Sequence, residues 1–258
     1  MKRVTAFVGS ARKKSTYNAV CQFLENLQSL GDVEYEIVVL SDHRLGTCRG
    51  CQVCFQKGEE FCPLKDDRDV LIEKIMASDG VVFASPNYSF QVSAIMKIFL
   101  DSLGFVFHRP RFFGKTFTSI VTQGFFGGDK IVKYLDFVAS GLGFNTVKGC
   151  CVTVLDPMTE KEKQKTEKVI AEHSRRFYER LVKHAFPVPT LFKLWGFRMA
   201  RTNIEMLLKD GDRDYTYYRD KGWFESDYYY PVHLGVLKKA TGGLFDSMEA
   251  RKARQRVS

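Results

Sequence analysis

The chain has no apolar run long enough to cross a bilayer, no internal repeat and no low-complexity tract. It does not open on a secretory signal, because the residues after Met1 form too short an apolar stretch. These absences argue against a membrane-spanning, fibrous or exported protein. The five histidines are scattered, and no Ser-His-Asp or paired-carboxylate arrangement emerges, so no catalytic acid or base is nominated. We expect a soluble, cytoplasmic protein.

A single basic face is also missing. Lysine and arginine total 39 against 30 acidic residues, which gives a net charge of +9. Acidic and basic residues alternate over residues 161–168, as on a solvated helix, and only residues 251–256 form a dense basic block. The charge therefore does not predict nucleic-acid binding, and a mild attraction for anionic cofactors is the simpler use of it.

Strand and helix patterns alternate over the first two-thirds of the chain. Strands are expected at residues 4–9, 35–40, 80–85, 116–122 and 146–155. Helices are expected at residues 16–30, 67–77, 92–103, 129–140 and 159–184. This alternation predicts an α/β fold, a five-stranded parallel sheet with helices on both faces. Ligands of such sheets bind beyond the carboxyl ends of the strands, in the loops at residues 9–16, 85–90 and 122–128.

The segment after Pro187 and Pro189 has a different character. Residues 186–258 hold 13 aromatic residues and no strand–helix rhythm. We divide the chain into a domain over residues 1–185 and a C-terminal aromatic-rich extension over 186–258, with a helix near 190–209 and then an irregular Tyr-rich stretch. We expect the extension to form a homo-oligomer interface or a lid, because aromatic residues suit interfaces. The alternative is an amphipathic helix lying on a membrane, which is less favoured because no lipidation motif is present.

The first of these loops has the features of a phosphate site. Gly9-Ser10-Ala11-Arg12-Lys13-Lys14-Ser15-Thr16-Tyr17-Asn18 follows a strand and opens a helix, whose N-terminus offers free N–H groups to an anion. Hydroxyls and a guanidinium add further donors. Helix capping by Ser15 or Thr16 is the structural alternative, and the two uses are compatible. Neither a Walker A loop nor the three-glycine dinucleotide fingerprint is present, so a mononucleotide loop fits best.

Two motifs together resemble a known family. Gly9-Ser10-Ala11-Arg12-x-x-Ser15-Thr16-x-Asn18 resembles the FMN-phosphate loop of flavodoxin-like NAD(P)H-dependent FMN reductases. The run from Ser85-Pro86-Asn87-Tyr88 to Lys97-x-Phe99-x-Asp101 is similar to their second signature, a loop that lies along the flavin ring. The resemblance covers about residues 1–184 and implies a flavodoxin-like fold.

The resemblance implies a set of FMN-binding residues from three loops. The expected FMN contacts are Ser10, Arg12, Ser15, Thr16, Asn18, Pro86, Asn87, Tyr88, Ser89, Phe90, Thr122, Gln123 and Gly124. Within this set Tyr88 and Phe90 are expected to supply an aromatic wall for the ring, and the alternative is that either is a plain core residue.

Four cysteines crowd one short loop in the spacing Cys-x2-Cys-x2-Cys-x7-Cys. They are Cys48, Cys51, Cys54 and Cys62. In a reducing compartment such a cluster favours metal binding or redox chemistry over a structural disulfide. An iron–sulfur cluster, a structural zinc and free thiols that form a reversible disulfide all fit this spacing. The other three cysteines occupy helix- or strand-like runs and are expected to be small core residues.

The cysteine spacing also resembles the compact motif of iron–sulfur flavoproteins, which hold a [4Fe-4S] cluster beside FMN. The resemblance implies an FMN-dependent oxidoreductase that takes electrons from NAD(P)H or a ferredoxin-like donor and passes them to a small-molecule acceptor, with the four cysteines as ligands of a one-electron relay. The alternative is an electron-transfer or redox-sensing flavoprotein without a substrate of its own.

Overall fold

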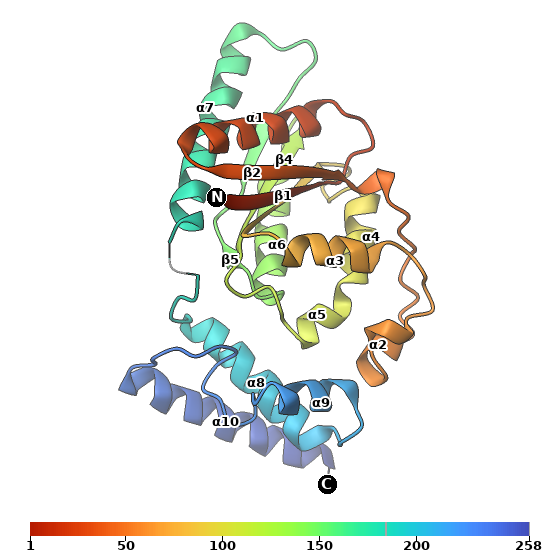
Figure 1. Cartoon of the computed structure of the whole chain (residues 1–258), viewed down its shortest axis with the longest axis vertical. Coiled ribbons are helices and arrows are strands. Elements are labelled where there is room, and N and C mark those ends of the chain that lie inside the picture. The colour runs from red at the N-terminus through yellow and green to blue at the C-terminus, as the bar shows by residue number, and fades with distance from the viewer. Residues whose placement is uncertain (184, 258) are drawn as a thin grey trace. The chain divides into compact units, whose positions relative to one another are not determined.

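The computed structural model describes residues 1–183 and 185–257 (Figure 1). The chain separates into two compact units. The first unit comprises residues 1–49, 64–104 and 110–185, and the second comprises residues 50–63, 105–109 and 186–258. Two short internal segments thus belong with the C-terminal segment. The domain boundary placed at residue 185 on sequence grounds stays a prediction.

The first unit is built on a parallel sheet. Its strands follow the order β2-β1-β3-β4-β5, and β6 also pairs with β4. Their bounds are β1 (Lys2–Val8), β2 (Val33–Val39), β3 (Gly80–Pro86), β4 (Thr116–Gln123), β5 (Asn145–Thr146) and β6 (Cys150–Thr153). Every pairing is parallel. The order is that of flavodoxin-like doubly wound folds, so the predicted α/β class is confirmed.

The sheet has six strands rather than the predicted five, because the last predicted strand is interrupted. Between β5 and β6, polar side chains take the hydrogen bonds that a neighbouring strand would make: Thr118 Oγ1 donates to Val147 O at 3.1 Å, and Gly149 N donates to Asp136 Oδ2 at 3.2 Å. A Cβ at residue 149 would collide with Ser119 Oγ, so this close approach requires glycine.

Five helices of the first unit lie close to their predicted positions. They are α1 (Ser15–Leu30), α3 (Arg68–Met76), α4 (Ala94–Ser102), α6 (Gly128–Gly141) and α7 (Glu160–Leu181), and a short η1 (Leu40–Asp42) follows β2. Helix α4 begins at Ala94 because Ser93 Oγ accepts a hydrogen bond from Met96 N and caps it. The predicted end of α7 at His184 falls outside the described residues.

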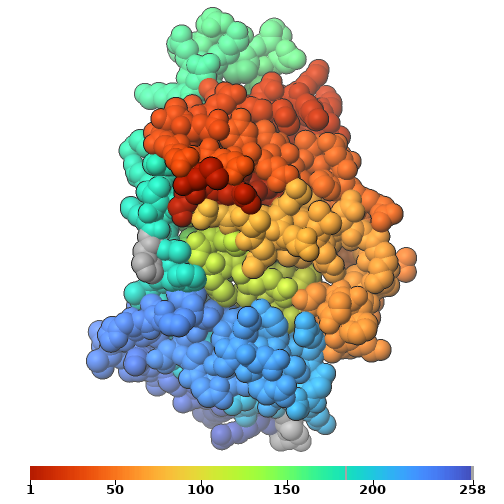
Figure 2. All heavy atoms as spheres, viewed as in Figure 1, coloured from red at the N-terminus to blue at the C-terminus, as the bar shows by residue number. Residues whose placement is uncertain are grey.

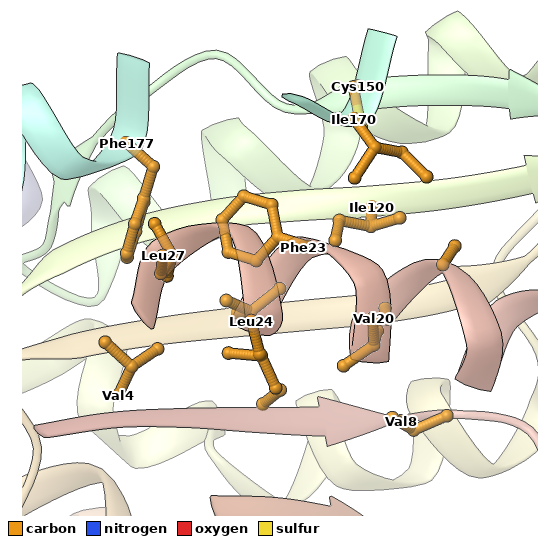
Figure 3. Close-up of a cluster of buried hydrophobic side chains, with 14 of the residues drawn as sticks. Val4, Val8, Val20, Phe23, Leu24, Leu27, Ile120, Cys150, Ile170 and Phe177 are labelled. Carbon is orange, nitrogen blue, oxygen red and sulfur yellow. The ribbon is translucent and has the colours of Figure 1, made fainter. Parts of the chain in front are cut away.

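The two faces of the sheet bury different side chains. Along β1, Val4, Ala6 and Val8 face one side, as the two-residue period of a strand requires. There they join side chains of α1 and α7 in a core that includes Phe23, Leu24, Leu27, Ile170 and Phe177 (Figure 3). On the other face Phe7, Phe83, Phe99 and Phe117 pack ring against ring with centroids 5.1–5.7 Å apart. A core on each side holds the sheet, and with it the strand ends, in place.

The second unit is mainly helical. Its elements are α2 (Val53–Gln56), η2 (Glu59–Phe61), most of α5 (Gly104–His108), α8 (Leu191–Leu207), α9 (Arg213–Asp220) and α10 (Val236–Val257). Helix α8 confirms the helix predicted near 190–209. The irregular stretch predicted after it is wrong over α9 and α10. In Figure 2 the residues of this unit from 187 to 257 are coloured from teal to blue. None of the helices within residues 1–183 and 185–257 has the length and apolar content needed to cross a membrane.

A buried arginine joins the three segments of the second unit. Arg109 is fully buried and forms ion pairs with Asp214 on α9 and, at 2.9 Å, with Glu59. Its Nη2 also donates to the carbonyl of Cys54 at 2.8 Å. Because removing one partner of a buried charge is costly, each segment depends on the other two.

Candidate functional site

Three loops meet where β1, β3 and β4 end. Gly9 N donates to Ala84 O at 2.8 Å, and Asn87 N donates to Thr122 O at 2.7 Å, so each loop is tied to its neighbour just beyond the sheet. Together with the residues after β6, these loops form an open cleft of about 230 Å³ in the first unit. Nine predicted site residues line it: Ser10, Arg12, Ser15, Thr16, Pro86, Tyr88, Thr122, Gln123 and Gly124.

The cleft opens at the N-terminus of α1. Lys14 is the N-cap residue, and no side chain among the described residues caps the helix there. The alternative of capping by Ser15 or Thr16 is therefore wrong. Since the first N–H groups of a helix lack intrahelical acceptors, this end keeps donors for an anion. The loop reaches this position because Gly9 passes close to α4, where an added Cβ would lie 2.8 Å from Met96 Cβ.

A buried pair of hydroxyls joins α1 to β4. Thr16 Oγ1 lies 2.7 Å from Thr122 Oγ1, and both residues are buried. The hydrogen bond fixes the start of α1 against the end of β4, so two walls of the cleft are held at a set separation.

The loop after β3 is a tight turn in a strained conformation. Tyr88 and Gln91 exchange two backbone hydrogen bonds of 3.0 Å, and Ser89 and Phe90 between them have φ angles of 49° and 62°. Non-glycine residues rarely adopt this left-handed region, which costs about 1–3 kcal/mol and recurs at functional sites. The turn leaves Tyr88 half-exposed on the cleft wall, while Phe90 packs against Phe126.

Four predicted site residues do not line the cleft: Asn18, Asn87, Ser89 and Phe90. Asn18 is exposed on the first turn of α1. Asn87 acts on the loops instead, because its Nδ2 donates to Phe126 O at 2.9 Å. Ser89 and Phe90 form the outer part of the turn.

Three lining residues were not predicted: Lys14, Val154 and Asp156. Lys14 lies in the predicted phosphate loop. Asp156 follows the last strand at the same edge of the sheet. Because ligands of parallel sheets bind beyond the carboxyl ends of the strands, Asp156 could have been predicted as a site residue. With Arg12, the charged lining has two cations and one carboxylate.

The side-chain amide of Gln123 has a fixed orientation. Its Oε1 accepts from Gly128 N at 2.8 Å, and its Nε2 donates to Thr153 Oγ1 at 3.2 Å. Because the oxygen and the nitrogen of the amide are both hydrogen-bonded, the amide has a single orientation at the cleft.

The four cysteines of the run differ in exposure. Cys48 and Cys51 are exposed, and Cys54 and Cys62 are partly buried. Among residues 1–183 and 185–257, no three His, Cys, Asp or Glu side chains gather closely enough to hold a metal ion. The donor set of four accessible thiols suits a cluster or zinc by its chemistry.

Two cysteines outside the run, Cys150 and Cys151, have thiols that are difficult to ionise. Burial raises the pKa of Cys150 to about 12 and that of Cys151 to about 11, so both stay protonated near neutral pH. Cys150 lies in the core between α1, α7 and the sheet, in agreement with its predicted structural role.

The sequence matches the model of a known family over residues 2–155, and that family is the NADPH-dependent FMN reductases. The chain belongs to this family. It is 34% identical over 143 residues to an iron–sulfur flavoprotein of Archaeoglobus fulgidus, covering 55% of this chain and 64% of that one. It is 26% identical to an iron–sulfur flavoprotein of Clostridioides difficile, covering 75% of this chain and 85% of that one. The chain thus spans just under two thirds of the Archaeoglobus relative.

Solved structures share the fold. RosB with a bound intermediate, 8-demethyl-8-formylriboflavin-5'-phosphate, superposes with a TM-score of 0.57 at 14% identity, covering 92% of each chain. A putative quinone reductase from Klebsiella pneumoniae superposes with a TM-score of 0.53 at 18% identity, covering 73% of this chain and 88% of that one. At these identities the likeness concerns the fold alone.

The hydroxyl pair at the cleft predicts a coupled effect on stability. Thr16→Val or Thr122→Val alone leaves one buried hydroxyl unpaired and should destabilise the protein by about 1–3 kcal/mol. The double variant removes both polar groups and should lose less than the sum of the two single losses. Urea unfolding of the four proteins measures the coupling. Thr16→Val combined with Thr153→Val, at an exposed position, is the matched control and should be additive; additivity of the Thr16 and Thr122 changes would contradict the pairing.

Proposed function

We propose that the cleft holds FMN and that NAD(P)H reduces it there. The observation that carries the proposal is the uncapped start of α1, which lies in one cleft with Arg12 and Lys14. Free backbone donors, the positive end of the helix dipole and two cations form a site for a phosphate monoester. Ser10, Ser15 and Thr16 line the same end of the cleft with hydroxyl groups.

The remaining lining suits the flavin ring. Pro86 and Tyr88 offer an apolar and aromatic wall, and Thr122, Gln123 and Gly124 offer polar groups from the end of β4. Bound FMN would supply hydride and single-electron transfer. The chain's own share is to bind and orient: the strained turn holds Tyr88 on the wall, and Gln123 presents its amide in one orientation.

The phosphate site predicts that one cation of the loop matters more than its neighbour. Arg12→Ala removes a lining guanidinium and should weaken FMN binding by about tenfold or more, the size of a lost charge-assisted hydrogen bond. Lys13→Ala removes the same charge from the adjacent position, which does not line the cleft, and should have a much smaller effect. FMN titration followed by flavin fluorescence measures both. Equal losses would mean that only the overall charge of the loop attracts FMN.

The electron donor separates the proposed reductase from an electron carrier. FMN-loaded protein mixed anaerobically with NADPH or NADH should lose the absorbance of the oxidised flavin. This reduction should be at least as fast as steady-state turnover. Reduction by a ferredoxin-like donor alone would instead support an electron-transfer or redox-sensing role. Colourless protein after FMN reconstitution would contradict both roles.

We also propose that Cys48, Cys51, Cys54 and Cys62 are the ligands of a [4Fe-4S] cluster. The support is the spacing of the four residues, the exposed or partly buried positions of their side chains, and the iron–sulfur flavoproteins among the relatives. Such a cluster would supply one-electron transfer. The chain's part is to present four deprotonated sulfurs, which the protonated thiols of Cys150 and Cys151 are unsuited to do.

The cluster assignment predicts a sharp division among the cysteines. Protein purified anaerobically should contain iron and acid-labile sulfide in the proportion of a four-iron cluster. Changing any one of the four cysteines to serine should lower the iron content severely, whereas Cys21→Ser, which is outside the run, should leave it unchanged. Zinc without sulfide would identify a structural metal site instead, and metal-free protein with four titratable thiols would favour a reversible disulfide.

A further inference from the structure

A second cavity lies wholly within the second unit. It has a volume of about 590 Å³, which is in the range of small-molecule sites. Its walls come from all three segments of that unit: Gln52, Phe55, Gln56, His108, Asn203, Ile204, Leu207, Leu208, Asp212 and Asp214. None of these residues lines the cleft assigned to FMN. The FMN site therefore leaves this cavity unexplained.

The cavity has an apolar wall and an aromatic one. Ile204, Leu207 and Leu208 come from the end of α8 and the residue after it. Phe55 stacks on the imidazole of His108 with ring centroids 4.2 Å apart and planes inclined by 26°. Flat rings beside aliphatic side chains favour a planar apolar ligand.

His108 is held in one tautomer by a buried carboxylate. Its Nδ1 lies 2.7 Å from Asp214 Oδ2, while Oδ1 of the same carboxylate pairs with the buried guanidinium of Arg109. Asp214 is 4% exposed, and because a carboxylate oxygen at this distance pairs with an N–H, the ring carries its proton on Nδ1. Nε2 on the opposite edge is then an acceptor in the neutral ring. It has no hydrogen-bond partner among the described residues, and the His108 side chain is half-exposed.

The charges of the lining exclude anionic ligands. Among the described lining residues there is no lysine or arginine, and the two carboxylates are those of Asp212 and Asp214. The other polar groups are the neutral amides of Gln52, Gln56 and Asn203. Arg109 compensates the charge of Asp214 from outside the lining, so the carboxylate of Asp212 is the one that would repel an anionic ligand, and no lysine or arginine of the described lining would attract it.

We propose that this cavity binds a neutral planar aromatic molecule that carries a hydroxyl group, of the phenol or hydroquinone class. The ring would lie against the apolar and aromatic walls, and the hydroxyl would donate to His108 Nε2. This inference rests on the second unit alone and does not depend on FMN being bound in the first.

The test uses the full chain and three probes of similar size. Naphthol should bind measurably in isothermal titration calorimetry, methoxynaphthalene, which lacks the donor, should bind more weakly, and anionic naphthalenesulfonate should bind weakest. His108→Phe keeps an aromatic ring beside Phe55 but removes the acceptor. It should weaken naphthol binding by about three- to tenfold, the size of one neutral hydrogen bond, and leave methoxynaphthalene binding unchanged.

A second pair of variants tests the location. Leu207→Trp should fill the cavity and abolish naphthol binding, whereas Leu237→Trp, at an exposed position on α10, should have no effect. Circular dichroism of each variant checks its folding. Three results would overturn the proposal: naphthol binding that persists in folded Leu207→Trp, equal effects of His108→Phe on naphthol and methoxynaphthalene, or competition between naphthol and FMN. Weak FMN binding alone would count against the proposed function and not against this cavity.

Discussion

The hydrogen bonds that continue the sheet one residue beyond its strands set the geometry of the cleft. Gly9 N bonds to Ala84 O, and Asn87 N bonds to Thr122 O, so the loops after β1, β3 and β4 start from the same edge in a fixed register. The parallel pairing brings the three strand ends together, and the cores on both faces keep the strands from sliding. The helix start, the strained turn and the Gln123 amide all take their positions from this edge.

Much of this arrangement could be predicted from the sequence, because apolar alternation and strand ends are local signals. The loops at residues 9–16 and 85–90 were predicted in this way, and both contribute residues to the lining of the cleft. The break between β5 and β6 could not be found, since it depends on Thr118 and Asp136, which meet residues 147 and 149 only after folding. Helix α10 was not predicted; it contains Gly242 and Gly243, which weaken a helical sequence pattern.

The two units use polar groups in contrasting ways. In the first, the cleft keeps its donors available, because α1 starts without a side-chain cap. In the second, Asp214 is shared between Arg109 and His108, which leaves one imidazole nitrogen available. In both places the capacity to bind follows from a hydrogen-bonding group that local structure leaves unpaired, while the polar groups around it are held by fixed partners.

The buried pairing of Arg109 also bears on how the chain must be made. Residues 50–63 and 105–109 leave the ribosome long before α9 supplies Asp214. The ion pair between Arg109 and Asp214 therefore forms only after the C-terminal segment has been made, whereas the pair with Glu59 joins two earlier segments. The C-terminal segment is thus the last part of the second unit to be made, and it completes a unit that begins more than a hundred residues earlier in the chain.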